Sequence, residues 1–335
     1  MSDDGIPNGF DGDYNNTHRA FLQALLAHQT ITLETAKPIL AAVQSAHTPE
    51  RPTLPQDISQ EDFDNYIHTL NSTISAFDFE IRSTLHQKTK ERIYALVNTT
   101  DDALTQMSTS FSADEIAFVK RVLDAIFETF NTPRAEIMAV TSMQALKLAR
   151  PPAEDRRQSG AATQQGTQGA NANAGLSMVH AEKVLRLLVE EGWFELSQKG
   201  YYSLSPRALM ELRGWLIETY NEQAEEEEDD DDAERVKIKF CAACREIVTV
   251  GQRCPNGTCN ARVHNHCIRN LFRSQGGREE CPTCNTAWQD PLPVGEKAAR
   301  PGGGARRTTG PSSTVGRRTT NGTVESDAVS GAEED

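Results

Sequence analysis

All seven cysteines of this chain lie between residues 241 and 284, and two histidines stand among them. Two cysteine pairs, CAAC at 241–244 and CPTC at 281–284, have the spacing at which one turn of the chain brings two thiolates to a single Zn²⁺ ion. The remaining cysteines are Cys254, Cys259 and Cys267. Seven thiolates and one histidine supply eight ligands, which is too many for one ion, so the sequence predicts two four-coordinate zinc sites.

Two histidines compete for the single histidine position, His264 and His266. Two residues separate His264 from Cys267, as in the CAAC and CPTC pairs, whereas His266 is the immediate neighbour of Cys267. Neighbouring side chains of an extended segment point to opposite sides, so His266 and Cys267 are poorly placed to bind the same ion. We therefore expect His264 to be the ligand, with His266 stacked outside the site or hydrogen-bonded to a ligand.

The spacing of the ligands leaves their pairing open, because sequential and interleaved pairings both give two sites of four. In either case all ligands come from the protein, so the two Zn²⁺ ions are expected to be structural. Each would contribute on the order of 10 kcal/mol to the folding of a segment with little apolar core of its own. The chain shows no Ser-His-Asp, nucleotide-loop or carboxylate-pair constellation, and we predict no catalytic nucleophile.

The composition of the chain narrows the class of protein. The formal net charge of -14 over 335 residues argues against a protein that coats nucleic acid. Aromatic residues make up only 6%, which predicts sizeable disordered parts. Cysteine is absent before residue 241 and no export signal is recognisable, so the cysteines indicate metal binding in the cytosol or nucleus. No stretch approaches the roughly 18 apolar residues of a membrane span.

The elements that precede the cysteines follow a repeated pattern. Residues 16–100 predict three helices and then a β-hairpin that turns at HQKTKE (86–91). The second helix is expected to start at Thr32 or Thr35 with Pro38 in its first turn, and the third helix at Ser59. The apolar stripes of the first and third helices comprise Phe21, Leu22, Leu25, Leu26, Phe63, Ile67, Leu70, Ile74 and Phe77. Three helices and a hairpin form the winged-helix arrangement, a relative of helix-turn-helix.

The same order recurs in residues 101–220. A capping box of Ser112 and Glu115 opens one helix, a second covers about 134–149, and a third covers 177–191 and ends at Gly192. A hairpin around 198–200 and a helix from 205 to about 220 complete the pattern, and a low-complexity insertion at 151–175 interrupts it. The sequence thus predicts an α+β multidomain chain with two tandem winged-helix domains followed by a small two-zinc module.

The predicted boundaries divide the chain as follows: a disordered tail (1–15), the first winged-helix domain (16–100), the second (101–220), an acidic linker (221–236), the zinc module (237–291) and a disordered Gly/Arg/Thr-rich tail (292–335). The linker contains eight consecutive acidic residues, whose mutual repulsion favours a solvated spacer.

The ligand order of four cysteines, one histidine and three cysteines resembles that of the cross-braced RING, variant-RING and PHD zinc modules. This resemblance selects the interleaved pairing. It implies one site, called site one below, formed by Cys241, Cys244, His264 and Cys267. It implies a second, called site two, formed by Cys254, Cys259, Cys281 and Cys284.

Within these modules, Pro282 after the seventh ligand, followed by Trp288, resembles the end of a RING, and Glu279 stands where PHD fingers usually carry an aromatic residue. RING ligases contact a ubiquitin-conjugating enzyme through three positions that correspond here to Ala243, Leu271 and Pro282. Ala243 is smaller than the usual aliphatic residue, and Asn285 replaces a basic residue that many active ligases use to contact ubiquitin.

Residues 77–100, 178–216 and the zinc module together resemble the non-SMC element one family, the RING-like subunits of the structural-maintenance-of-chromosomes five-six complex, in a fungal form. The resemblance implies a nuclear protein of DNA repair and recombination. It implies partners in the MAGE-type non-SMC element three, the kleisin non-SMC element four and the SMC five-six heterodimer. It also implies ubiquitin ligase activity that the MAGE-type partner enhances, without a nucleophile in this chain. A non-catalytic scaffold subunit and a PHD-like chromatin reader are the alternatives.

Four basic residues around the first hairpin are candidates for non-specific DNA contacts: Arg82, Lys88, Lys90 and Arg92. An ordinary solvated hairpin is the favoured alternative, because the chain as a whole is acidic. The helix at 177–191 offers one Arg and no Asn or Gln on its charged face, so we expect no sequence-specific reading of bases.

Overall fold

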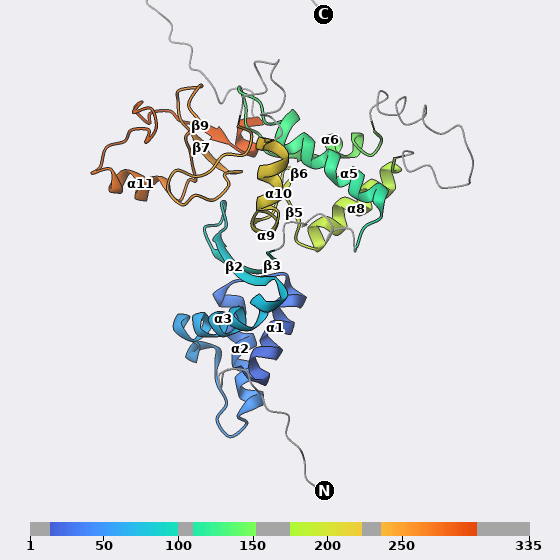
Figure 1. Cartoon of the computed structure of the whole chain (residues 1–335), viewed down its shortest axis with the longest axis vertical. Coiled ribbons are helices and arrows are strands. Elements are labelled where there is room, and N and C mark those ends of the chain that lie inside the picture. Colours follow the sequence, from blue (N-terminus) through green and yellow to red (C-terminus); the bar gives the residue numbers. More distant parts are fainter. Residues whose placement is uncertain (1–13, 100–109, 152–174, 223–235, 300–335) are drawn as a thin grey trace, which may run out of the picture. The chain divides into compact units, whose positions relative to one another are not determined.

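The computed structural model describes residues 14–99, 110–151, 175–222 and 236–299 (Figure 1). We call residues 14–99 the N-terminal region, residues 110–151 and 175–222 the middle region, and residues 236–299 the cysteine-rich module. The predicted tail at 1–15, the insertion at 151–175, the acidic run and most of the last tail fall largely outside the described residues. No helix in the described ranges is long and apolar enough to cross a membrane.

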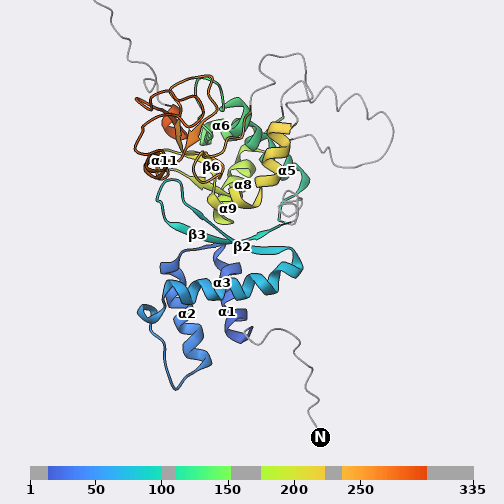
Figure 2. The same cartoon turned by 60° about the vertical axis from the view of Figure 1, so that its left-hand side comes forward.

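The N-terminal region contains three helices and one antiparallel sheet. Its helices are α1 (Asn16–His28), α2 (Leu33–His47) and α3 (Gln60–Ile74), with short 3-10 turns η1 (Pro55–Asp57) and η2 (Ser75–Phe77). Its strands are β1 (Thr30–Ile31), β2 (Phe79–Leu85) and β3 (Arg92–Asn98), in the order β1-β3-β2. Helices α1 and α3 pack against the sheet, and α2 packs on α1 and α3 (Figure 2). The side chains of Thr32 and Ser59 accept backbone N–H groups at the starts of α2 and α3, which confirms both predicted caps.

Three details of the N-terminal region differ from the sequence predictions. Pro38 is the sixth residue of α2 rather than part of its first turn, since Thr32 and not Thr35 is the cap. Leu26 is 61% exposed, because it lies about 100° around the helix from the buried Leu25. Phe77 is 71% exposed, because α3 ends at Ile74 and the following turn carries Phe77 out of the apolar stripe.

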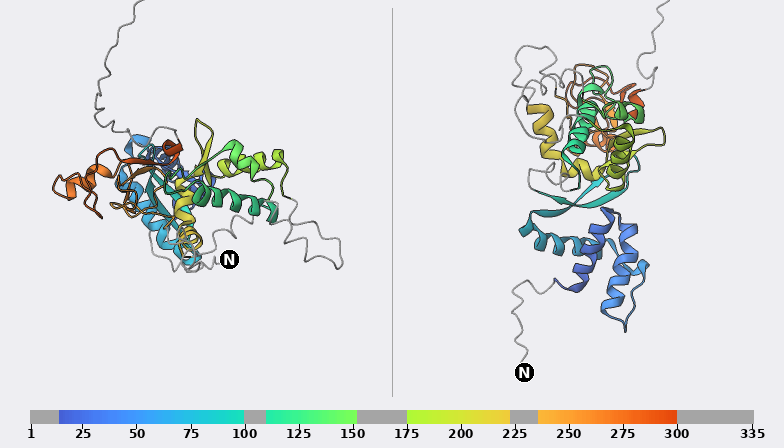
Figure 3. Two further views of the ribbon diagram at one scale, coloured as in Figure 1. Left: turned by 90° about the horizontal axis from the view of Figure 1, so that it is seen from above. Right: turned by 90° about the vertical axis from the view of Figure 1, so that its right-hand side faces the viewer.

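The middle region has a second sheet with the same pattern of strand order. Its helices are α5 (Ala113–Asp124), extended by a π-helical turn η3 (Ala125–Thr129), α6 (Ser142–Lys147), α8 (Met178–Glu190), α9 (Pro206–Glu211) and α10 (Arg213–Ile217), with a last π-helical turn η4 (Glu218–Glu222). Its strands are β4 (Val140–Thr141), β5 (Phe194–Leu196) and β6 (Tyr201–Leu204), in the order β4-β6-β5. Helices α5 and α8 lie side by side (Figure 3).

The Ser112 capping box, the helix before Gly192 and the hairpin before Ser205 are confirmed. The predicted helix over 134–149 is wrong in its first half. Residues 140 and 141 form strand β4, which pairs with β6, and the helix begins only at Ser142 after the Thr141 cap. A pairing with residues about sixty positions later outweighs the local helical pattern here.

The cysteine-rich module contains a third small sheet and one short helix. Its elements are β7 (Gly251–Arg253), β8 (Arg262–Val263), α11 (Ile268–Ser274), β9 (Leu292–Val294) and a 3-10 turn η6 (Glu296–Ala299). The strand order is β8-β7-β9. The predicted disordered tail from 292 is therefore wrong at its start, because β9 pairs with β7 and the side chain of Val294 is buried.

Two large apolar cores hold these parts together, and a third small cluster of Ala95, Val97 and Met210 links β3 to α9. The N-terminal region has its own core, whose largest fully buried side chains include Phe21, Phe63 and Leu70. The middle region and the cysteine-rich module share one continuous core that runs from Phe111 to Val294. The apolar residues of the module thus extend the core of the middle region and do not form a core of their own.

Candidate metal centre

The two cysteine pairs of the module form equivalent turns. In the first, the Cys241 N–H donates to the Glu246 carbonyl at 2.8 Å and the Arg245 N–H donates to the Cys241 carbonyl at 2.9 Å. Arg245 has a φ of 65°, in the left-handed region. An antiparallel bridge between Phe240 and Ile247 closes this turn. The turn brings the thiols of Cys241 and Cys244 into one four-ligand cluster.

The second pair repeats this arrangement. The Cys281 N–H donates to the Thr286 carbonyl at 2.8 Å, and the Asn285 N–H donates to the Cys281 carbonyl at 3.0 Å. Asn285 has a φ of 56°, a backbone conformation that Asn tolerates better than most residues. The residue after the second cysteine has a left-handed backbone in both turns. This requirement is a structural reason for an asparagine at position 285.

Site one gathers the first pair with His264 and Cys267. The Nδ1 atom of His264 lies 3.3 Å from the Cys244 Sγ atom and 3.9 Å from the Cys267 Sγ atom. Together with Cys241, the four ligand atoms lie within 4.8 Å of one another. The cluster is the one that the resemblance to cross-braced modules implies.

The second ring nitrogen of His264 shows which of its atoms faces the metal position. Its Nε2 atom lies 3.2 Å from the Ile247 carbonyl, and a carbonyl only accepts, so Nε2 carries the proton. Nδ1 is then the unprotonated nitrogen that a metal requires. His266 is absent from the cluster and stacks on His264, with ring centroids 5.0 Å apart and planes at 8°. Burial lowers the pKa of His266, which keeps this stacked ring neutral.

Site two gathers four thiols from three segments. The Sγ atoms of Cys254 and Cys284 are 3.5 Å apart, and those of Cys259 and Cys281 are 3.7 Å apart. Zn–S bonds of about 2.3 Å at tetrahedral angles place sulfur atoms roughly 3.8 Å apart. The separations of the thiols therefore fit the edges of a zinc tetrahedron.

The electrostatics of the thiols also call for a cation. Burial, together with the neighbouring cysteines, raises the pKa of Cys254, and burial raises the pKa of Cys267 to about 11. Several adjacent thiols do not ionise together unless a positive charge compensates them, and a divalent ion supplies that charge. The two four-residue clusters are consistent with two structural Zn²⁺ ions, which would fix the fold of the module.

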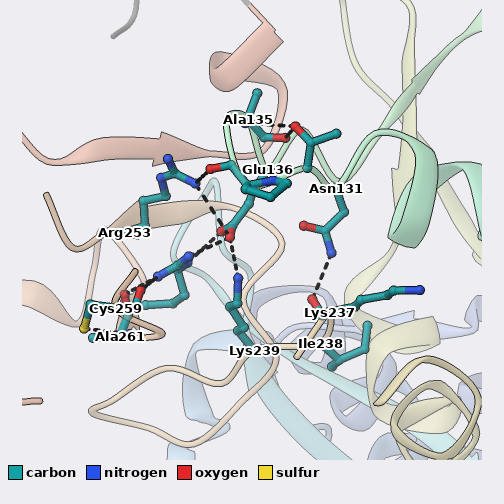
Figure 4. Close-up of polar contacts among 12 residues, drawn as sticks. Asn131, Ala135, Glu136, Lys237, Ile238, Lys239, Arg253, Cys259 and Ala261 are labelled. Carbon is teal, nitrogen blue, oxygen red and sulfur yellow. Dashed lines mark hydrogen bonds and ion pairs between the residues drawn. The ribbon is translucent and has the colours of Figure 1, made fainter. Parts of the chain in front are cut away.

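A buried ion cluster joins the module to the middle region (Figure 4). The Glu136 side chain is 1% exposed. Its carboxylate accepts hydrogen bonds from the Nε and Nη2 atoms of Arg262 at 2.6 Å each and from the Nζ atom of Lys239 at 2.5 Å. Arg253 adds a third positive charge at 3.8 Å, while its Nη1 donates to the Pro133 carbonyl at 2.8 Å. Segments more than a hundred residues apart in the chain thus meet at one carboxylate.

This cluster also reaches a zinc ligand. The Nη1 atom of Arg262 donates to the carbonyls of Cys259 and Ala261 at 2.8 Å each. Burial opposes ionisation of Glu136, but the hydrogen bonds and charges of Arg262 and Lys239 outweigh it and lower the pKa of Glu136 to about 2. The carboxylate is therefore charged at neutral pH.

The sequence matches two family models. A family model described as "Nse1 non-SMC component of SMC5-6 complex" matches residues 18–212, more than half of the chain, and a model described as "RING-like domain" matches residues 241–284. The chain belongs to the Nse1 family.

Relatives within the Nse1 family span most of the chain. "Non-structural maintenance of chromosomes element 1 homolog" of Homo sapiens is 23% identical over 282 residues, which cover 84% of this chain and 87% of that protein. "Non-structural maintenance of chromosomes element 1" of Schizosaccharomyces pombe is 23% identical over 69% of this chain and 79% of that protein. A solved structure described as "Nse1-Nse3-Nse4 complex" contains a chain with the same fold, at a TM-score of 0.58 and 21% identity over 82% of this chain and 97% of that chain.

The resemblance to RING ligases assigns three residues to contact with a conjugating enzyme, and these residues differ in their exposure to solvent. Ala243 and Pro282, each inside a cysteine pair, are exposed. Leu271, on α11, is only 7% exposed and belongs to the shared core. Its neighbour Phe272 is half-buried and packs edge-on against Trp288, with ring centroids 6.3 Å apart. Leu271 therefore offers little surface to a partner in this Nse1-family chain.

Three of the four basic residues of the hairpin have a side-chain partner within the chain. Arg82 pairs with Glu80 at 2.8 Å, and Lys88 pairs with Glu195 of β5 at 3.0 Å. Arg92 donates to the Ser83 hydroxyl at 3.1 Å, and Lys90 is exposed. Their role as DNA contacts stays a prediction.

Sequence reasoning did not find two residues that support the metal centre, Glu136 and Gln87. Glu136 is an isolated acidic residue in a segment predicted to be helical, and Gln87 is one polar residue of a turn. Their partners lie between 103 and 163 positions away along the chain. No local periodicity or spacing signals such contacts.

Proposed function

We propose that this protein is a RING-type ubiquitin ligase subunit of the SMC five-six complex that acts in DNA repair and recombination in the nucleus. The observation that carries the proposal is the interleaved pair of four-ligand clusters within a RING-like domain. In this mechanism the chain binds a conjugating enzyme already charged with ubiquitin and orients the reacting bond. No nucleophile of this chain takes part.

The proposed partners follow from the family. They are the MAGE-type Nse3 subunit, the kleisin Nse4 subunit and the SMC five-six heterodimer. The description of the family and the composition of the solved Nse1-Nse3-Nse4 complex support them. We further propose that the N-terminal and middle regions are winged-helix domains. Both have a sheet in which the third strand lies between the first and the second, and in both a hairpin supplies the second and third strands.

A second function, that of a scaffold subunit without ligase activity, is favoured by one specific observation. Leu271 is buried, so one of the three positions of the conjugating-enzyme surface is largely covered. The module also shares its core with the middle region, as expected for a part that stiffens the subunit. The exposure of Pro282 favours the ligase.

Ubiquitin discharge from a charged conjugating enzyme separates the two functions. The zinc-loaded chain with its Nse3-type partner is expected to accelerate discharge. Pro282→Ala is expected to slow it about fivefold, the effect of losing about 1 kcal/mol at a contact surface, with two zinc ions retained per chain. Cys281→Ser serves as the comparison that loses zinc as well. If no conjugating enzyme discharges faster with the zinc-loaded complex, the ligase proposal fails and the scaffold remains.

A further inference from the structure

One backbone carbonyl next to site one receives two N–H donors from different parts of the chain. The Ile247 carbonyl accepts from the His264 Nε2 atom at 3.2 Å and from the Gln87 Nε2 atom at 2.9 Å. A carbonyl oxygen has two lone pairs and accommodates both donors. Ile247 itself is 2% exposed, so neither donor is replaced by water without a rearrangement.

Gln87 comes from the tip of the β2–β3 hairpin (residues 86–91) in the N-terminal region. Its Oε1 atom accepts the Val250 N–H at 2.7 Å, the Thr249 N–H at 3.0 Å and the Thr249 hydroxyl at 3.3 Å. One amide side chain thus binds the segment 247–250 through its donor and its acceptor at once. Rotating the amide by 180° would turn its contacts with the Ile247 carbonyl and the two backbone N–H groups into mismatches, so its orientation is fixed.

We propose that Gln87 is a positioning residue for zinc site one. By holding the Ile247 carbonyl, it holds the outer N–H of His264 and so the direction of Nδ1 toward the thiols of Cys244 and Cys267. Groups that hydrogen-bond to the outer nitrogen of a metal-binding histidine orient the ring and increase its affinity for the metal. Gln87 acts on His264 through the Ile247 carbonyl, to which both side chains donate. It comes from the N-terminal region, whereas His264 lies in the cysteine-rich module. The proposal does not depend on ligase activity.

The next residue of the hairpin provides a matched control. The Nζ atom of Lys88 pairs with the Glu195 carboxylate of the middle region at 3.0 Å, and none of its described contacts reaches the 247–250 segment. Lys88→Gln therefore weakens the attachment of the same hairpin without changing the bond to Ile247. Site two, in the same molecule, is a second internal control.

Two substitutions separate the donor of Gln87 from its acceptor. Gln87→Glu keeps an oxygen that accepts from the Thr249 and Val250 N–H groups. It removes the N–H group that donates to the Ile247 carbonyl. Gln87→Met has a similar length and removes every hydrogen bond. The full chain would be loaded with two Co²⁺ ions, whose absorption bands differ between a Cys₃His and a Cys₄ ligand set. Loss of each ion to a chelator is then followed separately.

Gln87→Glu and Gln87→Met are both expected to speed release from the Cys₃His site about tenfold, the low end of the effect of removing an outer partner of a metal ligand. Release from the Cys₄ site, and from both sites in Lys88→Gln, should match the unchanged chain. The proposal is overturned by unchanged release in Gln87→Glu, or by equal acceleration at both sites. If Gln87→Met does not fold with two ions, the comparison of Gln87→Glu with Lys88→Gln decides alone.

Discussion

At the scale of single residues, Glu136 is the shared anion of a buried ion cluster. It is a buried carboxylate that faces three positive side chains, two of them at hydrogen-bonding distance. Its folded pKa of about 2 lies below the ordinary value of 4.5, so its ionised form stabilises the folded state above about pH 4.5. This contribution is complete at neutral pH and is lost as the pH falls from 4.5 toward 2.

Glu136→Gln is expected to lower the free energy of unfolding by about 3–5 kcal/mol at pH 7, because it leaves buried cations without their counter-charge. Tryptophan fluorescence in urea, with zinc present, measures this change, since Trp193, Trp215 and Trp288 all lie in the shared core or pack against it. Glu246→Gln is the control, because it removes a half-exposed carboxylate that pairs with Arg213 beside the same core and should cost under about 1 kcal/mol. Equal effects of the two substitutions would contradict this assignment.

At the scale of elements, β9 shows that the cysteine-rich module does not end with its last ligand. The strand pairs with β7, and the backbone N–H of the following Gly295 donates to the carbonyl of Glu136 at 2.8 Å. Gly295 has a φ of 94°, and a Cβ atom there would lie 2.8 Å from the Thr249 carbonyl, so the close turn requires glycine. The strand thus connects the module to the same segment that carries the ion cluster.

A chain truncated after residue 291 should therefore be less stable than one truncated after residue 299. Loss of the buried Val294 side chain alone removes about 1.5–3 kcal/mol of apolar burial, before any backbone bonds are counted. Thermal melting followed by tryptophan fluorescence compares the two truncated chains with the full one. Melting of the 291 truncation at the temperature of the full chain would show that β9 contributes nothing to the module.

The elements that the sequence predicted correctly have their signals close together in the chain. Ser59 and Ser112 each start a helix through a residue three positions later, and three pairs of ligands, at 241/244, 264/267 and 281/284, have the two-residue gap of a chelating turn. Strand β4 and the burial of Leu271 depend on residues far away in sequence, and neither follows from local patterns. For the same reason the zinc ligands were predictable, while the residues that hold them in place, Gln87 and Glu136, were not.

At the scale of the whole molecule, the described residues have two large apolar cores and a third, small cluster of Ala95, Val97 and Met210. The N-terminal region has one, and the middle region and the cysteine-rich module have the other in common. Zinc binding is therefore coupled to the folding of more than the module that contains the ligands. The cysteines Cys241, Cys254 and Cys281 are themselves members of the shared core.

Removal of zinc by a chelator should unprotect backbone amides in α5 and α8 as well as in the module, while α3 in the N-terminal region keeps most of its protection. Hydrogen exchange measured by mass spectrometry on the full chain, with and without chelator, gives this comparison directly. Re-addition of Zn²⁺ should restore the original pattern. Full protection of α5 and α8 in the metal-free chain would show that the common core tolerates an unfolded module.

The position of Glu136 in the chain has a consequence for biosynthesis. A ribosome makes this residue roughly a hundred positions before Lys239 and Arg262, the cations that neutralise it. Domains generally fold in order as they emerge, at about 5–20 residues per second. For several seconds after its synthesis, the Glu136 carboxylate therefore has none of the cations that later surround it. The attachment of the middle region to the cysteine-rich module through this carboxylate can form only after the metal-binding segment has been made.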